Sequence, residues 1–497
     1  GGAAGGTVEL HAVDGMTVAG NVSATGNGGI GGTVNVTGDE VNVGPMAVVD
    51  ASGATGGGNI NIGGGFQGRV VSLRNSSKTN VAAGAVIRAD ATQSGNGGQI
   101  AVWSDGETDF RGFASVAGVG NGGVVEVSGL ETLTYSGSVD LSGGTGENGF
   151  LLLDPVDVTI GQVNSDGSTV GDGNAAAGSA QEPGLGAGVI DADALIAAWN
   201  SGNVVVHTSG VGSGVGKIDI ESDVQIIGNN SNSLSFFAHE DINVAFNASD
   251  RGATQIVNHG SGNINLVAGW DGGGVSLFGP NLVANADPSN VVDQTSSHAL
   301  APSGAISAAD LRAGTYGSYG DAGDINLNPD DFYFQVEIGS AGGETNLFAR
   351  NLIARVGNET DEHVHIGFNT SHYDAATTSP VTGDINIELL GSSFLTSTGS
   401  GERYIQIGHG AHTSDATGTA AAVPLSGDIT FNAEGILQAN GGGGNGYVLI
   451  GHGGRLVNFP TMTGDINVNA SALFLNAGTS NQDFVQIGHG GQQITGT

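Results

Sequence analysis

The chain has 497 residues, of which 92 are Gly and none is Cys. Twelve Lys and Arg residues against 48 Asp and Glu residues give a formal net charge of −36. This balance argues against binding to nucleic acid or anionic lipid, because both need a basic surface. Aliphatic residues are plentiful and the Gly residues follow no collagen-like triplet, so the composition predicts a folded chain rather than a disordered one.

A repeat runs through the first 160 residues. Gly pairs open successive units at residues 5, 31, 57, 97 and 122, and Asn148-Gly149 stands at the next equivalent position, so the steps are 26, 26, 40, 25 and 26 residues. Each Gly pair is followed by a run with an aliphatic residue at every second position, which is typical of a strand with one apolar side. These runs span residues 7–10, 33–36, 59–62, 99–102 and 124–127.

Two more short runs complete each unit, as at Leu133–Tyr135 and Ser138–Leu141. Three strands and three turns per unit predict one coil of a parallel β-helix, in which inward aliphatic side chains stack on their equivalents in neighbouring coils. We expect the Gly residues at positive φ and at tight corners, where β-branched residues do not fit.

The end of this segment resembles a known family. The motifs are the run Gly-Gly-Val-Val-Glu-Val-Ser-Gly-Leu-Glu-Thr-Leu-Thr-Tyr from Gly122, then Ser138–Ser142, then Leu151-Leu152-Leu153-Asp154-Pro155. Together they resemble the filamentous-haemagglutinin-type large exoproteins, which are bacterial adhesins exported by two-partner secretion. The resemblance covers roughly residues 1–160, and the family's secretion domain with its Asn-Pro-Asn-Gly signature is not in this sequence. Neither end of the sequence reads as a cap, so we expect a segment of a longer polypeptide.

The 40-residue step between Gly57 and Gly97 contains an insertion. Residues 69–73 and 85–87 both read as strands, and the insertion at 69–88 is expected to leave the coil on one side. It contains four of the twelve basic residues, namely Arg69, Arg74, Lys78 and Arg88. A solvated loop and a contact site both stay open as interpretations.

The best helix signal lies at residues 191–200, within a transitional stretch. Asp191 can cap its N-terminus, and Asn200 with Gly202 can end it. Ala194, Leu195, Ala198 and Trp199 form one apolar stripe. This helix is expected either to cover the side of the solenoid or to interrupt it before a second segment.

The later strands repeat less regularly at first. Runs from Lys217, Asp241, Asn263 and Asp324 share one polar–Ile–polar–aliphatic pattern, with a long insertion at 270–318. From about residue 341 two linked motifs return in order. Gly-Asp-Ile begins at residues 383, 427 and 464, with Gly343-Glu344-Thr345 as a weaker copy, and Ile-Gly-His-Gly begins at residues 407, 450 and 487, with Ile366-Gly367-Phe368 as a degenerate copy.

The expected organisation is one long rod. It comprises haemagglutinin-type coils at 1–160, the loop and helix at 161–215, irregular coils with long insertions at 216–340, and longer repeats at 341–497. We estimate roughly 14–18 coils and a length of roughly 65–90 Å. The fold class is all-β, a right-handed parallel β-helix, with the hand taken from the family and from the preference of parallel crossovers.

Three aligned His residues are the first candidate site. His409, His452 and His489 should stack in neighbouring coils about 5 Å apart. A His column can bind a transition metal. The fourth equivalent position is Phe368, however, which indicates a slot for a flat ring at a corner, so packing is favoured over metal binding.

An aromatic column is the second candidate. Tyr404, Tyr447 and Phe484, with His363 in the same register, are predicted to face outward, where they either form a ladder or contact a glycan or protein partner. Gln406, Gln486 and His365 lie beside this column.

The densest group of acidic and His residues comprises Glu359, Asp361, Glu362, His363 and His365. Calcium prefers carboxylate oxygens as ligands, but the spacing of these residues matches no calcium-binding motif. A solvated loop is therefore the favoured interpretation.

These observations favour a structural or adhesive shaft of a secreted exoprotein on the bacterial cell surface, acting in adhesion, aggregation or biofilm formation. The expected partners are a receptor or glycan on a host or neighbouring cell and, from the resemblance, an outer-membrane transporter during export; nucleic acid and membrane insertion are not expected. An extracellular filament or matrix protein stays open as an alternative. A β-helix carbohydrate-active enzyme or glycan-binding module is less favoured, because the acids are scattered, and we expect no catalysis, no resident cofactor and at most loosely bound calcium.

Overall fold

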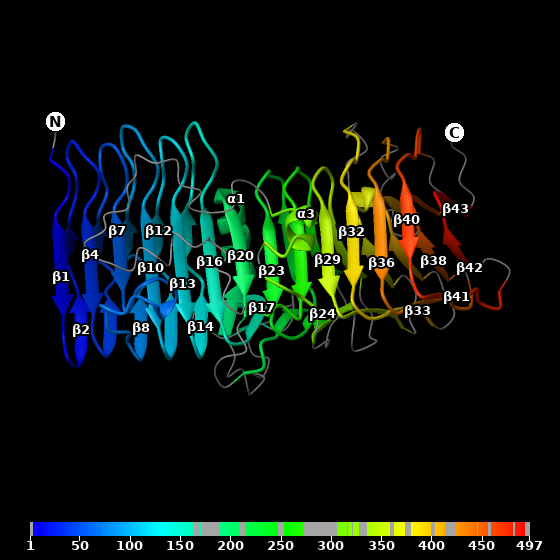
Figure 1. Ribbon diagram of the computed structural model, residues 1–497, viewed down its shortest axis with the longest axis horizontal. Helices are drawn as coiled ribbons and strands as arrows, with labels where there is room; N and C mark the ends of the chain where they lie inside the picture. The colour runs from blue at the N-terminus through cyan, green and yellow to red at the C-terminus, as the bar shows by residue number, and fades with distance from the viewer. Residues whose placement is uncertain are drawn as a thin grey trace.

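The computed structural model shows an elongated stack of coils with the N-terminus at one end and the C-terminus at the other (Figure 1). It describes residues 3–163, 169–170, 188–208, 214–246, 253–271, 306–315, 317–320, 322–327, 335–357, 362–372, 379–398, 403–412, 423–444, 446–455, 459–480 and 483–492. Within these residues every strand pairing of the coils is parallel, and only the short β17–β18 pair is antiparallel. The predicted parallel β-helix is therefore confirmed.

Two long sheets run the length of the rod. The first sheet contains β1 (Thr7–His11), β4 (Thr33–Thr37), β7 (Asn59–Ile62), β10 (Gln99–Ser104), β13 (Val124–Gly129), β16 (Phe150–Pro155), β20 (Asn203–His207), β23 (Leu234–Ala238), β26 (Ile264–Ala268), β29 (Thr345–Ala349), β32 (Ile385–Leu389), β36 (Ile429–Ala433) and β40 (Ile466–Asn469). The second contains β2 (Gly15–Val18), β5 (Glu40–Val43), β8 (Lys78–Val81), β11 (Glu107–Phe110), β14 (Thr132–Tyr135), β19 (Gly188–Asp191), β17 (Val158–Val163), β21 (Ile218–Glu221), β24 (Ile242–Phe246), β27 (Asp324–Leu327), β30 (Asn351–Val356), β33 (Ser393–Ser397), β37 (Ile436–Asn440) and β41 (Ala472–Asn476), with β18 (Thr169–Val170) on β17.

The third side of the rod is divided among smaller sheets. The third sheet contains β3 (Asn21–Ser23), β6 (Val48–Asp50), β9 (Val86–Arg88), β12 (Phe113–Ser115) and β15 (Ser138–Asp140). The fourth contains β22 (Gln225–Gly228), β25 (Ala253–Asn258), β28 (Gln335–Ser340), β31 (His363–Ile366), β34 (Tyr404–Ile407), β38 (Tyr447–Ile450) and β42 (Phe484–Ile487). The fifth contains β35 (Gly410–His412), β39 (Gly453–Arg455) and β43 (Gly490–Gln492).

The register follows the sequence repeat residue by residue. Val34, Ile60, Ile100, Val125 and Leu151 occupy one inward row of the first sheet, and each is fully buried. Each such side chain contributes about 1.5–3 kcal/mol by leaving water. The main hydrophobic cluster continues in this way from Val18 to Ile450, with partly buried aliphatic residues at both ends.

The thirteen strands of the first sheet give thirteen coils within the described residues, fewer than the 14–18 expected. The second sheet has fourteen strands along its path, because both β19 and β17 lie between β14 and β21. At about 4.8 Å per coil, thirteen coils correspond to a rod of about 60 Å.

The Gly pairs lie at tight positions, as expected, but not at positive φ. A Cβ on Gly31 would lie 1.8 Å from the carbonyl oxygen of Ala51, and one on Gly97 would lie 1.7 Å from that of Val116. Neither Gly has a positive φ, so the backbone of the adjoining segment, rather than the dihedral angle, excludes a side chain. Positive φ does occur at the later corners, for example at Gly408 (152°) and Gly451 (156°).

The first insertion lies earlier in the chain than predicted. Residues 69–73 form no strand, and Val71 is 95% exposed, whereas residues 78–81 and 86–88 are the ordinary strands β8 and β9. The inserted segment is therefore 63–77, and it contains the 3-10 helix η1 (Phe66–Gly68). Strand-like composition was misleading here because an insertion has no neighbouring strand to pair with.

The predicted helix is present as α1 (Ala192–Ser201). The Asp191 carboxylate accepts hydrogen bonds from the backbone N–H groups of Asp193 and Ala194, and Trp199 is fully buried. The helix contacts β15, the last strand of the third sheet, and β22, the first of the fourth. Of the two roles expected, α1 interrupts the strands on this side rather than covering them.

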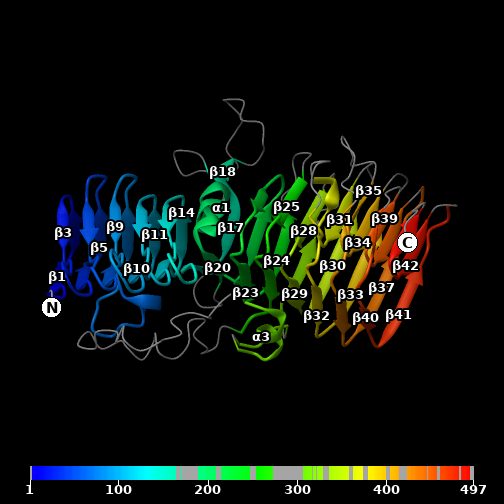
Figure 2. The same cartoon turned by 90° about the horizontal axis from the view of Figure 1, so that it is seen from above.

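A second α-helix was not predicted. Residues 308–312 form α3 (Ala308–Arg312), where Ser307 and Asp310 make a capping box. Figure 2 shows α3 and the 63–77 insertion outside the first sheet on the same side of the rod. A second 3-10 helix, η2, spans Thr370–His372. The described helices are all too short or too polar to cross a membrane.

The four runs that share the polar–Ile–polar–aliphatic pattern do not all lie in one sheet. Ile218, Ile242 and Ile325 are paired neighbours in the second sheet, but Ile264 lies in the first sheet. Both sheets present the same alternation of polar and aliphatic residues to the same core. The local pattern therefore identifies a strand but not the side of the coil on which it lies.

Candidate functional site

The His column forms as predicted. The imidazole centroids of His409 and His452 lie 4.9 Å apart, as do those of His452 and His489, with interplanar angles of 4° and 13°. Each Nδ1 accepts a backbone N–H from the preceding coil. The donors are Phe368 to His409 at 2.9 Å, His409 to His452 at 3.0 Å and His452 to His489 at 3.2 Å.

The other ring nitrogen joins the two sequence motifs of each repeat. Nε2 of His409 lies 2.6 Å from the carbonyl oxygen of Gly383. The corresponding distances are 2.8 Å from His452 to Gly427 and 2.9 Å from His489 to Gly464. Because Nδ1 accepts, the neutral ring carries its proton on Nε2 and donates it to this carbonyl. Burial lowers the pKa of His409 to about 3 and that of His452 to about 4. Both nitrogens are engaged with the backbone, which explains the motif by corner packing rather than by metal ligation.

The aromatic column also stacks, but it is not a surface. Centroids lie 5.1 Å apart for Tyr404 and Tyr447 and 4.7 Å apart for Tyr447 and Phe484. Tyr404 and Tyr447 are 1% and 0% exposed, and only Phe484 is partly exposed. Their prediction as outward contacts for a glycan or partner is therefore wrong for the two Tyr residues. Alternation along a strand shows which side a residue faces, but not whether a further layer covers that side.

The predicted acidic and His group is buried where it is described. Glu362, His363 and His365 are at most 2% exposed, so a solvated loop is wrong for these three, while Glu359 and Asp361 lie outside the described residues. His363 Nε2 lies 2.9 Å from the Glu337 carboxylate, and its ring stacks on Tyr404 at 4.7 Å.

Glu337 was missed by sequence reasoning. Its carboxylate also accepts hydrogen bonds from the side-chain amides of Gln255 and Asn369, each at 2.7 Å. Pairing of β28 with β31 is the signal that could have found it, since that pairing places Glu337 in register with His365. The buried carboxylate is enclosed by polar partners, as a structural polar network requires.

A second acid–His cluster lies on the outward face of the first sheet. It consists of Glu126 on β13, Asp154 on β16 and His207 on β20. Asp154 is in register with Ser128, and its Oδ1 lies 3.2 Å from His207 Nδ1. Glu126 accepts hydrogen bonds from the Gln67 backbone N–H at 2.8 Å and the Ser128 hydroxyl at 3.0 Å.

Burial dominates the protonation of this cluster. It raises the pKa of Glu126 and that of Asp154 to about 8 each, and it lowers the pKa of His207 to about 3. The Arg69 guanidinium, from the 63–77 insertion, works against the rise at both carboxyls and reinforces the fall at His207. All three groups are consequently uncharged at neutral pH.

An outer hydrophobic layer surrounds this cluster. Phe66 from the insertion and Ile306 and Leu311 from the α3 segment join the outward residues of the first sheet in one buried group. Trp270 packs edge-on against His207, with centroids 5.1 Å apart. The two insertions were expected as loops or contact sites, but their described residues act as covers over the first sheet.

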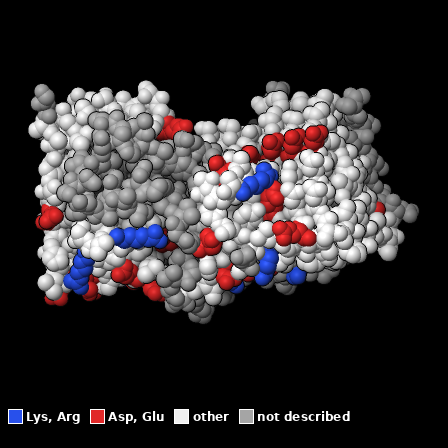
Figure 3. All heavy atoms as spheres, viewed as in Figure 1, with Lys and Arg blue, Asp and Glu red and all other residues white. Residues whose placement is uncertain are grey.

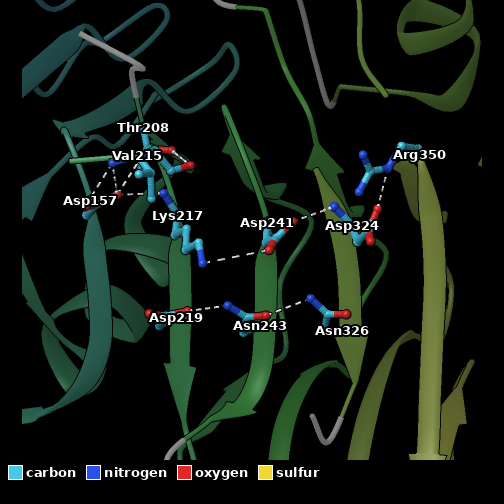
Figure 4. A network of polar contacts seen from close by, with 11 residues as sticks. Asp157, Thr208, Val215, Lys217, Asp219, Asp241, Asn243, Asp324, Asn326 and Arg350 are labelled. Atoms are coloured by element: carbon cyan, nitrogen blue, oxygen red, sulfur yellow. Dashed lines mark hydrogen bonds and ion pairs between the residues drawn. The ribbon is translucent and has the colours of Figure 1, made fainter. Parts of the chain in front are cut away.

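Several described cations connect coils. Lys217 Nζ lies 3.9 Å from Asp241, whose carboxylate accepts the Asp324 backbone N–H, and Arg350 pairs with Asp324 at 3.0 Å (Figure 4). In the first insertion, Arg74 pairs with Asp39 and Lys78 with Glu107. These basic residues are thus each held by an acidic side chain rather than gathered into a binding patch.

Acidic side chains do gather on the surface. Figure 3 shows a row of Asp and Glu over the start of β32, β36 and β40. Asp384, Asp428 and Asp465 precede these strands, and Asp384 and Asp428 each accept the backbone N–H of the next Asp at 2.8 Å. Among the described residues no three or more His, Asp or Glu side chains are arranged to hold a metal ion.

Comparison with known proteins does not identify the chain. No protein-family model matches it, and no curated protein matches it.

Proposed function

We propose that the chain forms part of the shaft of a bacterial surface exoprotein of the filamentous-haemagglutinin type, and that its role is to supply length. The observation that carries this proposal is the continuous core from Val18 to Ile450, which extends by one layer with every coil. Each coil contacts only its neighbours, so length is added without any distant contact. Such a rod holds a binding region away from the cell surface in adhesion, aggregation or biofilm formation.

Buried polar side chains also support a shaft. Side-chain ladders run along the rod axis, as in the series Asn265, Asn346 and Asn386, whose amides are joined at 2.7 and 2.9 Å. These groups bind the next coil rather than a ligand. The repeat and the Leu-Leu-Leu-Asp-Pro motif of residues 1–160 add the resemblance to exported adhesins. In this proposal the protein is extracellular, reaches the surface through an outer-membrane transporter, and presents its partner region to a receptor or glycan on another cell.

The proposal is tested by removing the whole segment from the gene of a surface-displayed parent protein. Attachment to cells and cell aggregation are measured together with surface display. We expect normal display and reduced attachment. If display is normal and attachment is unchanged, the adhesive role is wrong, and an extracellular filament or matrix role becomes the better explanation.

Adding the purified chain as a competitor separates a spacer from a direct binder. A spacer leaves attachment of the intact cells unchanged, whereas a chain that carries its own receptor-binding surface inhibits it. A second control removes residues 33–58 only, which shortens the rod by one coil and leaves the rest of the surface in place.

A further inference from the structure

The peptide bond between Asp154 and Pro155 lies at the end of β16, in the acid–His cluster of the first sheet. An Asp–Pro bond is intrinsically weaker than other peptide bonds, because the tertiary amide nitrogen of Pro is more basic and a better leaving group. The sequence contains one other such bond, Asp287–Pro288, which lies outside the described residues.

The surroundings of Asp154 are unusual for a carboxyl group. Its side chain is 13% exposed, and that of His207, 3.2 Å away, is 5% exposed. Within the described part of the chain neither ring nitrogen of His207 makes a hydrogen bond. A buried imidazole without a hydrogen-bond partner costs free energy and is not explained by packing alone.

We propose that Asp154–Pro155 is a self-cleavage site, in which the Asp154 carboxyl attacks its own main-chain carbonyl carbon and gives its proton to the Pro155 nitrogen, while the neutral His207 imidazole beside it positions the carboxyl. The attack forms a five-membered cyclic anhydride, and the bond from the Asp154 carbonyl carbon to the Pro155 nitrogen breaks. The proton lost by the carboxyl passes to that nitrogen, which leaves as a secondary amine. Water then opens the anhydride, so that one water molecule is consumed in total.

The cluster favours this reaction near neutral pH. An exposed Asp loses its proton near pH 4, so that little proton remains for the leaving nitrogen above that pH. Burial keeps the Asp154 carboxyl protonated up to a pKa of about 8. The groups that face it are Glu126 and Ser128 from β13, His207 from β20 and Arg69 from the insertion; Glu126 is also neutral at this pH and adds no repelling charge.

Cleavage would not divide the rod. β16 is paired with β13 on one side and β20 on the other, and Leu151 and Leu153 remain in the core. The products, residues 1–154 and 155–497, would therefore stay associated as a nicked solenoid. This modification goes beyond the shaft function and does not depend on it.

The test incubates the purified, folded chain near pH 6–7 and follows it by denaturing gel electrophoresis and intact mass. We expect two fragments, with Pro155 as the new N-terminus and Asp287–Pro288 intact. The same chain unfolded in urea at the same pH should be cut at least about tenfold more slowly, since the effective concentration of the groups depends on the fold. A folded chain that stays intact, or that is cut equally at both bonds or equally fast in urea, overturns the proposal.

Variants separate the roles. Asp154→Asn and Pro155→Ala should abolish the cut, and Asp287→Asn should leave it unchanged. His207→Leu should slow it by about tenfold or more, because the carboxyl loses the polar group that positions it, and His207→Gln, which keeps a polar side chain there, should recover part of the rate. A rate in His207→Leu equal to that of the unchanged chain overturns the role of His207. Folding of each variant is checked by circular dichroism, and Asp154→Glu, which must form a less favoured six-membered ring, provides a charge-preserving variant that should react more slowly.

Discussion

His452 shows how one residue connects three coils. Its Nδ1 accepts the backbone N–H of His409, its own backbone N–H binds the imidazole of His489, and its Nε2 binds the carbonyl oxygen of Gly427. The ring accepts a hydrogen bond from the neighbouring coil through Nδ1 and donates one to a carbonyl oxygen of its own coil through Nε2. It can do both only in its neutral form, because a protonated imidazole has two donors and no acceptor.

Acid should therefore weaken the last coils. The pKa of His452 is lowered to about 4 in the folded chain from an ordinary value near 6.5, so its contribution to stability is complete above about pH 6.5 and is lost as pH falls toward 4. His409, with a pKa of about 3, acts in the same direction. The amide hydrogens of Phe368 and His409 should exchange faster at about pH 4 than at about pH 7, after correction for intrinsic exchange, as measured by hydrogen exchange.

His452→Phe is the matched variant, because Phe is the natural residue at the equivalent position 368. It keeps a stacked ring but leaves the His409 N–H and the Gly427 carbonyl oxygen without their partner. We expect a loss of about 1–3 kcal/mol at neutral pH and a weaker pH dependence in the last coils. An unchanged pH dependence in this variant would mean that other groups cause the acid sensitivity.

Gly97 tests the close approach of backbone segments. A Cβ at this residue would lie 1.7 Å from the Val116 carbonyl oxygen, so Gly97→Ala must displace the backbone. Gly20→Ala is the control, since no atom lies within 4 Å of its added Cβ. In urea denaturation we expect a loss of about 2 kcal/mol or more for the first variant and a change within about 0.5 kcal/mol for the second. Similar values for both would contradict a packing requirement at the Gly pairs.

At the scale of elements, the two long sheets persist while the third side of the rod changes. The third sheet ends at β15, α1 occupies its place, and the fourth sheet begins at β22. The change is tolerated because the first and second sheets carry the register through it. Trp199 fixes the junction, with its indole N–H bound to the Asn232 carbonyl oxygen at 2.8 Å and the Asn232 amide bound to the Trp199 carbonyl oxygen.

This modular construction predicts that a complete coil can be removed. Deleting residues 33–58 joins Gly32 to Asn59, and Asn59 is the register partner of Thr33. The variant should remain folded, with the loss of one coil, because every strand regains an equivalent neighbour. Deleting residues 33–45 removes about half a coil and should disrupt folding. Circular dichroism and small-angle scattering measure both; equal disruption by the two deletions would contradict exchangeable coils.

At the scale of the molecule, charge is the dominant feature. Twelve basic residues cannot neutralise 48 acidic ones, and the cross-coil ion pairs such as Arg74–Asp39 are largely exposed and weak. Like-charge repulsion therefore acts along the whole rod, and added salt screens it. The thermal unfolding midpoint should rise as sodium chloride is increased from about 0.01 to 0.15 M. A falling midpoint would mean that the ion pairs outweigh the net repulsion.

The sequence by itself determined the fold, the position and N-cap of α1, and the stacking of His409, His452 and His489. These features depend on alternation, spacing and local capping, which are short-range properties that repeat from coil to coil. Sequence spacing was sufficient even for the His column, because residues at equivalent positions of a solenoid must be neighbours.

Only the tertiary structure decided what covers each strand. It buried Tyr404 and Tyr447, which alternation placed on an outward face, and it assigned Ile264 to the first sheet rather than the second. It also brought Glu126, Asp154 and His207 together beneath residues from two insertions. Covers and insertions have no period, and their contacts join segments far apart in the chain, so no local pattern of residues encodes them.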